Sequence, residues 1–166
     1  MIRKAHLNDI EILINLTKAC ARHLQSNGID QWNEHYPNIE VFSSDITRNE
    51  LYVLQYKKEI IGCVCLSDLM DDEYKNVSWI TPNQNNCYIH RLAIHPNYQG
   101  IGKARLIMNF VEDKARQKQY RSIRLDTFSK NLRNQKFYEL RGYRRLGNVY
   151  FLKQSKYPFF CYELLL

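Results

Sequence analysis

The chain of 166 residues has few of the features that mark membrane or secreted proteins. Its apolar runs are short, and IIGCVCL at 60–66 falls well below the roughly 20 residues that a membrane-spanning helix needs. The N-terminal segment MIRKAHLNDIEI has no apolar signal core. We therefore expect a cytoplasmic protein that does not interact with membranes.

The cysteines do not form a recognisable disulfide or metal-binding pattern. There are five of them, an odd number, and most lie inside apolar runs. The sequence contains no C-x-x-C pair and no Cys/His cluster with the spacing of a zinc site. These absences predict buried free thiols in a reducing compartment and no bound metal.

Acidic residues are fewer than basic ones, 17 against 24, which gives a formal charge of +7. Such a surface can attract nucleic acid, an acidic partner or a polyphosphate ligand, or it can simply be a solvated face. No helix-turn-helix, zinc finger or RNP-like aromatic motif is present. The sequence therefore favours a protein without a nucleic-acid partner.

Hydrophobic periodicity predicts one domain over residues 1–166, of the mixed α/β or α+β class. There is no repeat, low-complexity run or linker, and the polar segment 69–86 is expected to be a loop. The expected helices are 9–26, 38–49, 101–118 and 131–141, and the expected strands are a short one at IRKA, then 51–56, 59–67, 87–94, 122–128, 149–153 and 159–165.

The segment HPNYQGIGKARL, residues 95–106, places Gly100 and Gly102 where a predicted strand passes into a helix. The first N–H groups of a helix have no partner within it, and the helix dipole makes that end positive. Glycine lets a bulky anion approach the backbone, and Lys103 and Arg105 add charge. The pair predicts phosphate binding, with a plain tight turn as the alternative.

Two common phosphate motifs do not fit this segment. A Walker loop requires G-x-x-x-x-G-K-[ST], which is absent. In a dinucleotide-binding fingerprint, Arg105 would occupy the place of the third glycine. Both mismatches argue against P-loop and dinucleotide-binding folds.

HPNYQGIGKA resembles the acyl-coenzyme A motif Arg/Gln-x-x-Gly-x-Gly/Ala of the GCN5-related N-acetyltransferase (GNAT) family, with Asn97 at the first position. CYIHRLAIHP resembles the family's fourth strand, and LDTFSKNLRNQKFYELRGY resembles its next strand and helix. The resemblance is good over residues 50–152. The segments GIDQWNEHYPN and YIHRLAIHP look like those of a bacterial subgroup of unassigned substrate.

The resemblance implies a single GNAT-like domain with a central, mostly antiparallel twisted sheet of six to seven strands, flanked by helices and with a splayed fourth strand. It also implies an N-acetyltransferase that transfers acetyl directly from acetyl-CoA to a primary amine of a small molecule, amino acid derivative or peptide. The protein would be a monomer or homodimer. A non-catalytic acyl-CoA sensor or partner-binding module on the same fold is the alternative.

The resemblance places the acetyl-CoA site on the fourth strand, the glycine loop and the two helices that follow. Backbone N–H groups of residues 92–94 would stabilise the thioester oxyanion. The implied cofactor-binding residues are Leu92, Ala93, Ile94, Asn97, Tyr98, Gln99, Gly100, Ile101, Gly102, Lys103, Ala104, Asn131, Arg133 and Tyr138.

Tyr138 is the candidate general acid, since a phenol and a thiolate have comparable pKa values. It lies two helical turns from Asn131 and therefore on the same face, although it can also be a core aromatic residue. His90 is the candidate base, at a position where many relatives carry Glu. A structural histidine and a water chain to solvent remain alternatives.

The expected acceptor pocket is less well defined. The aromatic residues Trp32, Tyr36 and Trp79 would line it, or else form a lid packed on the core. Acidic and basic candidates point in opposite directions: Asp30 and Glu34 would attract an ammonium group, whereas Arg91 and Arg124 would select a carboxylate. The sequence therefore predicts an amine acceptor without naming it.

Overall fold

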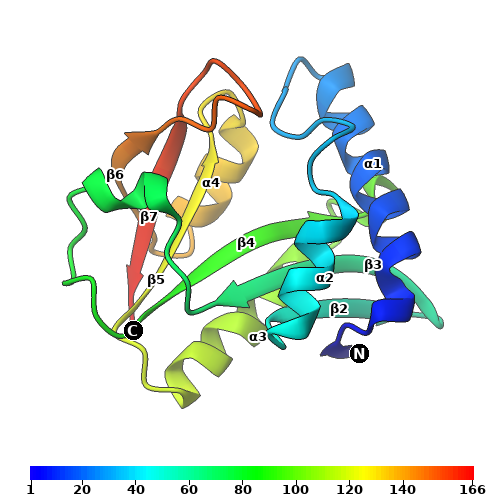
Figure 1. Ribbon diagram of the computed structural model, residues 1–166, viewed down its shortest axis with the longest axis horizontal. Helices are drawn as coiled ribbons and strands as arrows, with labels where there is room; N and C mark the ends of the chain where they lie inside the picture. The colour runs from blue at the N-terminus through cyan, green and yellow to red at the C-terminus, as the bar shows by residue number, and fades with distance from the viewer.

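An open sheet of seven strands forms the centre of the computed structural model, which describes residues 1–166 (Figure 1). The strands are β1 (Ile2–Lys4), β2 (Leu51–Tyr56), β3 (Glu59–Ser67), β4 (Asn86–Ile94), β5 (Ser122–Phe128), β6 (Arg144–Val149) and β7 (Phe159–Leu165), in the order β1-β2-β3-β4-β5-β7-β6. All neighbours are antiparallel except β4 and β5. The predicted fold class is confirmed.

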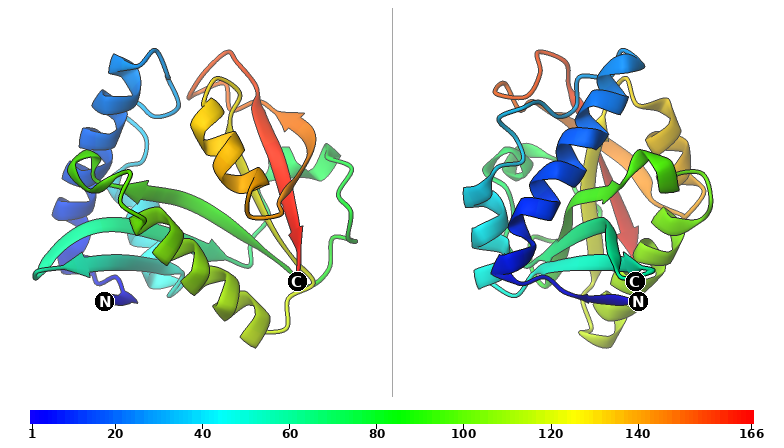
Figure 2. Two further views of the ribbon diagram at one scale, coloured as in Figure 1. Left: turned by 180° about the vertical axis from the view of Figure 1, so that it is seen from behind. Right: turned by 90° about the vertical axis from the view of Figure 1, so that its right-hand side faces the viewer.

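Four helices cover the two faces of this sheet. Helices α1 (Ile10–Ser26) and α2 (Ile39–Thr47) lie on one face, and α3 (Lys103–Gln117) and α4 (Leu132–Glu139) lie on the other (Figure 2). Because both faces are covered, β3 is buried continuously from Ile61 to Ser67 instead of alternating. No helix in the structure is long and apolar enough to cross a membrane.

Side-chain caps and glycine fix the ends of several helices. The Asn38 carboxamide oxygen accepts from the Val41 N–H at 3.0 Å and begins α2. Asn131 begins α4 in the same way through the Asn134 N–H, at 3.1 Å. Helix α1 ends just before Gly28, whose φ of 73° suits a residue without a side chain. These local signals explain why the predicted helices are close to the observed ones.

A bulge in β4 opens the sheet. Cys65 of β3 pairs with His90 and Cys63 pairs with Ala93, so Arg91 and Leu92 together face one residue of β3. Arg91 adopts a left-handed conformation there, with φ of 53°. Strand β4 pairs with β5 only from Asn86 to Tyr88. Beyond that point the two strands diverge, and Figure 1 shows the wedge-shaped separation between them. The splayed fourth strand is thereby confirmed.

The last part of the chain differs from the prediction. The strand expected at 149–153 is β6, Arg144–Val149, which pairs with β7 from Arg144–Glu163 to Val149–Phe159. The two arginines of this strand make it look like an exposed segment in the sequence. In the structure the Arg145 guanidinium packs over the Phe160 ring at 3.3 Å instead of projecting into solvent. The segment expected as a loop at 69–86 also contains a 3₁₀ helix, η2 (Asp72–Asn76). The five cysteines are free and buried, as predicted.

A buried ion pair holds the bulge in place. Arg91 Nε donates to Asp45 Oδ2 at 2.6 Å and its Nη2 donates to Asp45 Oδ1 at 2.8 Å. The two side chains are only 10% and 2% exposed. The pair therefore ties α2 to the point where β4 leaves β5.

We expect Asp45→Ala to lower the free energy of unfolding by about 3–5 kcal/mol, because it leaves the Arg91 charge buried without its partner. Denaturant titration measures this loss. Asp113→Ala is the control, since it removes an exposed ion pair with Arg116 and should cost less than about 1 kcal/mol. Equal losses for the two variants would contradict the role given to Asp45.

Candidate active site

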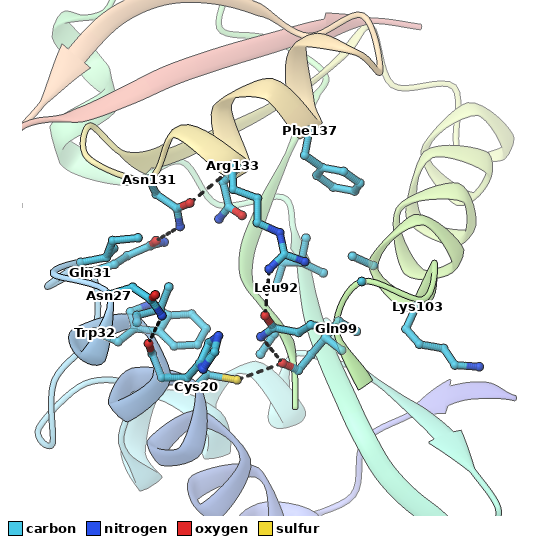
Figure 3. A pocket seen from close by; sticks show the side chains of 18 of the residues that line it. Cys20, Asn27, Gln31, Trp32, Leu92, Gln99, Lys103, Asn131, Arg133 and Phe137 are labelled. Carbon is cyan, nitrogen blue, oxygen red and sulfur yellow. Dashed lines mark hydrogen bonds between the residues drawn. The ribbon is translucent and has the colours of Figure 1, made fainter. Parts of the chain in front are cut away.

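A cavity of about 540 Å³ lies where β4 separates from β5, between α1 and the N-terminal ends of α3 and α4 (Figure 3). Most of the residues expected to bind acetyl-CoA line it: Leu92, Ala93, Ile94, Gln99, Gly100, Gly102, Lys103, Ala104, Asn131 and Arg133. Trp32, expected in the acceptor pocket, also borders it. The fold therefore brings together one strand, one loop and two helix ends.

The glycine loop at the head of α3 presents unpaired main-chain donors. None of the N–H groups from Gly100 to Arg105 has an acceptor in hydrogen-bonding geometry. Gly100 and Gly102 have φ values of 77° and 83°, and a Cβ on either would meet no atom within 4 Å. Glycine is thus required by the left-handed backbone, and the space in front of the loop is open. A row of free N–H groups bordering a cavity is suited to an anion.

The charges near this helix end agree with an anion site. The first turn of α3 has no acidic residue and begins with Lys103, followed by Arg105. Basic side chains at a helix N-terminus oppose the helix dipole by about 0.3–1 kcal/mol each. A bound polyphosphate would reverse that penalty, because it would interact favourably with the dipole and with both side chains.

Polar contacts fix the rim of the large cavity. Gln99 Nε2 donates to the Ile94 carbonyl oxygen at 2.9 Å, and Arg133 Nη1 donates to Gln99 Oε1 at 3.2 Å (Figure 3). On the other side, Asn131 Nδ2 donates to Gln31 Oε1 at 3.1 Å. Since the Asn131 oxygen already caps α4, this residue is less free to bind a ligand than its position in the sequence indicates.

Four residues of the predicted cofactor site do not line the large cavity: Asn97, Tyr98 and Ile101 of the loop, and Tyr138, which lines a smaller cavity described below. The Asn97 N–H donates to His95 Nδ1 at 3.3 Å, within a short 3₁₀ turn. The Tyr98 hydroxyl donates to Glu59 at 3.2 Å, and Ile101 is 63% exposed. The Asn97 contact is made by its main chain, and the free N–H groups belong to residues 100–105, so they do not depend on the unusual Asn97 side chain.

A second cavity, of about 60 Å³, adjoins the first and shares Gln31, Trp32, Leu92 and Asn134 with it. Of the residues predicted for chemistry and acceptor binding, it is lined by Tyr36, His90, Arg91 and Tyr138. It also contains two carboxylates that the sequence analysis missed, Asp71 and Asp126. The candidate catalytic groups therefore meet beside the larger cavity.

Tyr138 is 5% exposed, and its hydroxyl has no hydrogen-bond partner. Its ring packs against Phe137, Tyr143 and Tyr162, with centroid distances of 5.4, 5.7 and 6.1 Å. Burial raises the pKa of the phenol above its ordinary value, and Asp126 adds to the effect. Tyr138 is thus a protonated donor at neutral pH.

His90 has properties unlike those expected of a general base. Burial, followed by the charges of Arg91 and Arg48, lowers its pKa to about 3. Its Nδ1 lies 3.8 Å from Asp71 Oδ2, and the imidazole makes no hydrogen bond. At neutral pH the ring is uncharged and only weakly basic, which counts against the predicted role.

Two arginines proposed for carboxylate binding are already occupied. Arg91 binds Asp45, and its Nη1 also donates to the Tyr36 hydroxyl at 3.2 Å. Arg124 is fully buried, with Nε 3.1 Å from Glu163 Oε1. Neither guanidinium is available to select a substrate carboxylate.

Trp79 and the acidic residues of the early loop lie outside both cavities. The Trp79 ring centre is 4.5 Å from the Arg124 guanidinium carbon, and its Nε1 donates to the Tyr74 carbonyl oxygen at 3.0 Å. Trp79 therefore packs over a buried ion pair instead of contacting an acceptor. Asp30 is exposed, and the 81% exposed side chain of Glu34 contacts only His35, at 3.6 Å.

One of the missed carboxylates had a signal in the sequence. Asp126 interrupts SIRLDTF, whose other members are buried in the structure, and a charge within such a strand often marks a site. Asp71 had no such signal in the sequence, because it lies in a polar segment with several other acidic and amide residues. Only the path of that segment over β4 and β5 places it near His90.

Comparison with known proteins agrees with this geometry. A sequence model of the acetyltransferase (GNAT) family matches residues 14–143. The chain belongs to this family. The prediction of the family and of an acyltransferase is thereby confirmed. A search of curated proteins gave no match.

Solved GNAT structures share the fold. A GNAT acetyltransferase from Streptococcus agalactiae is 23% identical, with a TM-score of 0.82 over 100% of this chain and 95% of that one. One from Listeria monocytogenes is 20% identical, with a TM-score of 0.79 over 100% and 94%. PaiA N-acetyltransferase from Thermoplasma acidophilum, solved in complex with coenzyme A, is 17% identical, with a TM-score of 0.75 over 100% and 98%.

Asp126 should make stability depend on pH. Burial raises its pKa to about 7, whereas a carboxyl of the unfolded chain titrates near 3.9. Between these values the unfolded chain binds fewer protons, so the contribution of Asp126 to stability falls as pH rises. The ionisable groups around it are Tyr74, Asp71, Glu73, Arg91, His90 and Tyr138.

Because these neighbours are present in both proteins, the difference between Asp126→Asn and wild type isolates the carboxyl. We expect the variant to gain in unfolding free energy relative to wild type as pH rises from about 5 to about 8. Urea titrations across that range measure the difference. A difference that does not change with pH would show that Asp126 titrates normally.

Proposed function

We propose that this protein is an acetyl-CoA-dependent N-acetyltransferase that moves an acetyl group directly to a primary amine. One observation carries the proposal: the cavity bordered by free N–H groups at α3 continues into a smaller cavity that holds an unpaired phenol and two carboxylates. The first cavity suits a pyrophosphate ligand, and the second suits an amine and the proton transfers that its acylation requires.

The large cavity has two features that coenzyme A would use: a row of free main-chain N–H groups and an unpaired strand edge. The N–H groups of residues 100–105 would hold the pyrophosphate, and Lys103, Arg105 and Arg133 would add positive charge around the phosphates. Beyond Tyr88, β4 has no partner in β5, so its edge can pair with the extended arm of the ligand. The complex of PaiA with coenzyme A supports the same ligand class here.

Acetyl transfer needs a proton for the departing sulfur and stabilisation of the carbonyl oxygen. Acetyl-CoA supplies the acetyl group as a thioester. Tyr138 would donate its phenol proton to the sulfur as the C–S bond breaks. The main chain at the bulge, next to Leu92, is the candidate for holding the oxygen, because Arg91 and Leu92 have no register partner in either neighbouring strand.

The chemistry of Cys20 favours direct transfer over an acyl-enzyme. It is the only cysteine that lines either cavity. Burial raises the pKa of its thiol to about 12, and its Sγ donates to the Ile94 carbonyl oxygen at 3.2 Å. A protonated thiol engaged in this way is a poor nucleophile. The amine is therefore proposed to attack the thioester itself.

Calorimetry with acetyl-CoA tests the proposal first, with dephospho-CoA, NAD and duplex DNA as controls. We expect a dissociation constant in the micromolar range for acetyl-CoA and no binding of DNA. Gly102→Trp should abolish acetyl-CoA binding, since the indole would fill the open space in front of the loop. Gly142→Ala, at a comparable φ but outside both cavities, controls for backbone strain. Unchanged affinity in Gly102→Trp would overturn the loop assignment.

Tyr138→Phe separates an enzyme from a non-catalytic acyl-CoA sensor. We expect turnover to fall by about 10²-fold or more, because the sulfur loses its proton donor, while the affinity for acetyl-CoA is unchanged. Tyr143→Phe removes another buried hydroxyl, which donates to Glu112 away from the cavities, and should leave turnover nearly unaltered. If Tyr138→Phe retained full turnover, Tyr138 would be a packing residue.

A further inference from the structure

Three ionisable side chains from separate parts of the chain converge in the small cavity. Asp71 precedes η2, His90 lies on β4 and Asp126 lies on β5; one potential ligand atom from each lies within 4.8 Å of the others. The Tyr74 hydroxyl donates to Asp126 Oδ2 at 2.5 Å and holds that carboxylate in place. Asp71 remains 40% exposed, so the cluster reaches from the cavity to solvent.

No lysine or arginine forms an ion pair with either carboxylate of this cluster. Asp126 forms no ion pair, and the only charged-type contact of Asp71 is with the uncharged His90. The Arg91 guanidinium lines the cavity and its charge lowers the pKa of both carboxylates, but its hydrogen bonds go to Asp45 and the Tyr36 hydroxyl. The small cavity therefore has an excess of negative charge, which favours a positively charged ligand and disfavours a carboxylate.

Two further side chains indicate that a polar ligand belongs there. The His90 side chain is 10% exposed and Tyr138 is 5% exposed, yet neither the imidazole nor the hydroxyl has a hydrogen-bond partner. The only fully buried side-chain atoms without a partner are on Asn86 and Thr127, so the unpaired imidazole and hydroxyl remain accessible from the cavity. Both of these face the same cavity as the two carboxylates, so a ligand with N–H groups and a lone pair would satisfy them.

We propose that the small cavity binds the ammonium group of a primary amine that carries no carboxylate next to its nitrogen, and that the Asp71–Asp126 pair, not His90, accepts its proton. This inference rests on the proposed acetyl transfer and names its acceptor class and its base. His90 becomes a positioning residue, a neutral partner for the amine or for the carboxylates.

The size of the cavity agrees with such a ligand. A volume of about 60 Å³ holds a few non-hydrogen atoms, enough for an ammonium group and the adjoining methylenes. The remainder of the acceptor would extend along Tyr36, Phe151 and Gln154, which also line the cavity. A second charged group beside the nitrogen would have to lie against Asp71 or Asp126.

The proton transfer balances without another reactant. An N–H bond of the ammonium group breaks and an O–H bond forms on a carboxylate, which leaves a neutral amine and a carboxylic acid. The freed lone pair of the amine forms the N–C bond as the C–S bond breaks. Tyr138 gives its proton to the sulfur and is reprotonated by the second proton that the nitrogen loses. The proton first taken by the carboxylate pair passes to solvent through Asp71. Burial raises the pKa of Asp71 to about 6 and that of Asp126 to about 7, which suits a base at neutral pH.

Matched acceptors test the substrate class. Tyramine with tyrosine, and agmatine with arginine, are pairs that differ by one carboxylate. We expect kcat/KM to be about 10²-fold higher for the member that lacks it, because the carboxylate would face two like charges. Equal values within both pairs, or a preference for the amino acids, would overturn the inference.

Variants test the base with whichever amine is acetylated fastest. Asp126→Asn should lower kcat by about 10²-fold or more and remove the acidic limb of the pH profile, while calorimetry shows unchanged acetyl-CoA binding. Asp71→Asn, in an exposed segment, is a second variant that should lower kcat and raise KM without affecting folding. Glu73→Gln, an exposed neighbouring carboxylate outside the cavity, should retain wild-type rates.

The outcomes separate this inference from the proposed function. If wild-type protein does not bind acetyl-CoA, the proposed function fails. If it binds and transfers acetyl but Asp71→Asn and Asp126→Asn retain the wild-type rate and pH profile, or if His90→Gln alone removes the acidic limb, only the inference fails. Activity that EDTA abolishes and a divalent cation restores would reassign the three residues as a metal site.

Discussion

The interruption of pairing between β4 and β5 is the constraint on which the rest of the structure depends. Parallel pairing ends at Tyr88, and the bulge at Arg91 turns β4 away from its neighbour. A left-handed non-glycine residue within a strand is costly, and the two hydrogen bonds from Arg91 to Asp45 hold the side chain of this residue in place. Because the bulge is tied to α2, both cavities depend on Asp45, which lines neither of them.

The sheet remains one unit although β4 and β5 diverge, because its two faces are packed differently. Under α3, one apolar cluster is continuous across the division, with Ile107 and Val111 in the same core as Ile89 and Ile123. Under α1 and α2, a separate cluster covers only β2, β3 and the end of β4. The core under α3 thus holds β4 and β5 together on one face, while the C-terminal part of β4 diverges from β5. Helices α1 and α4 border the space between the two strands (Figure 1).

Electrostatics divides the opened space into two regions of opposite preference. The head of α3 offers free N–H groups, Lys103 and Arg105, and favours anions. The small cavity has Asp71 and Asp126, neither of which is ion-paired to a lysine or arginine, and favours cations. A reaction between a polyphosphate thioester and an ammonium compound needs an anion-binding and a cation-binding region within one site. The divergence of β4 from β5 places these two regions side by side without merging them.

What the sequence by itself determined was local. The glycine loop and most helices and strands were predictable because backbone conformation and hydrophobic periodicity depend on neighbouring residues. The family resemblance also came from contiguous motifs, residues 87–104 and 125–143. The strand at Arg144–Val149 was misplaced because its arginines look solvent-exposed until Phe160 is seen beneath one of them.

Only the tertiary structure decided which charges remain available. Arg91 looked able to bind a carboxylate until α2 brought Asp45 to it, and the burial that lowers the pKa of His90 counts against its predicted role as base. Asp71 and Asp126 gained importance because separate segments brought them together in one cavity. The physical reason is that the ionisation and pairing of a side chain depend on its desolvation and on charges that lie close in space, which the order of residues along the chain does not specify.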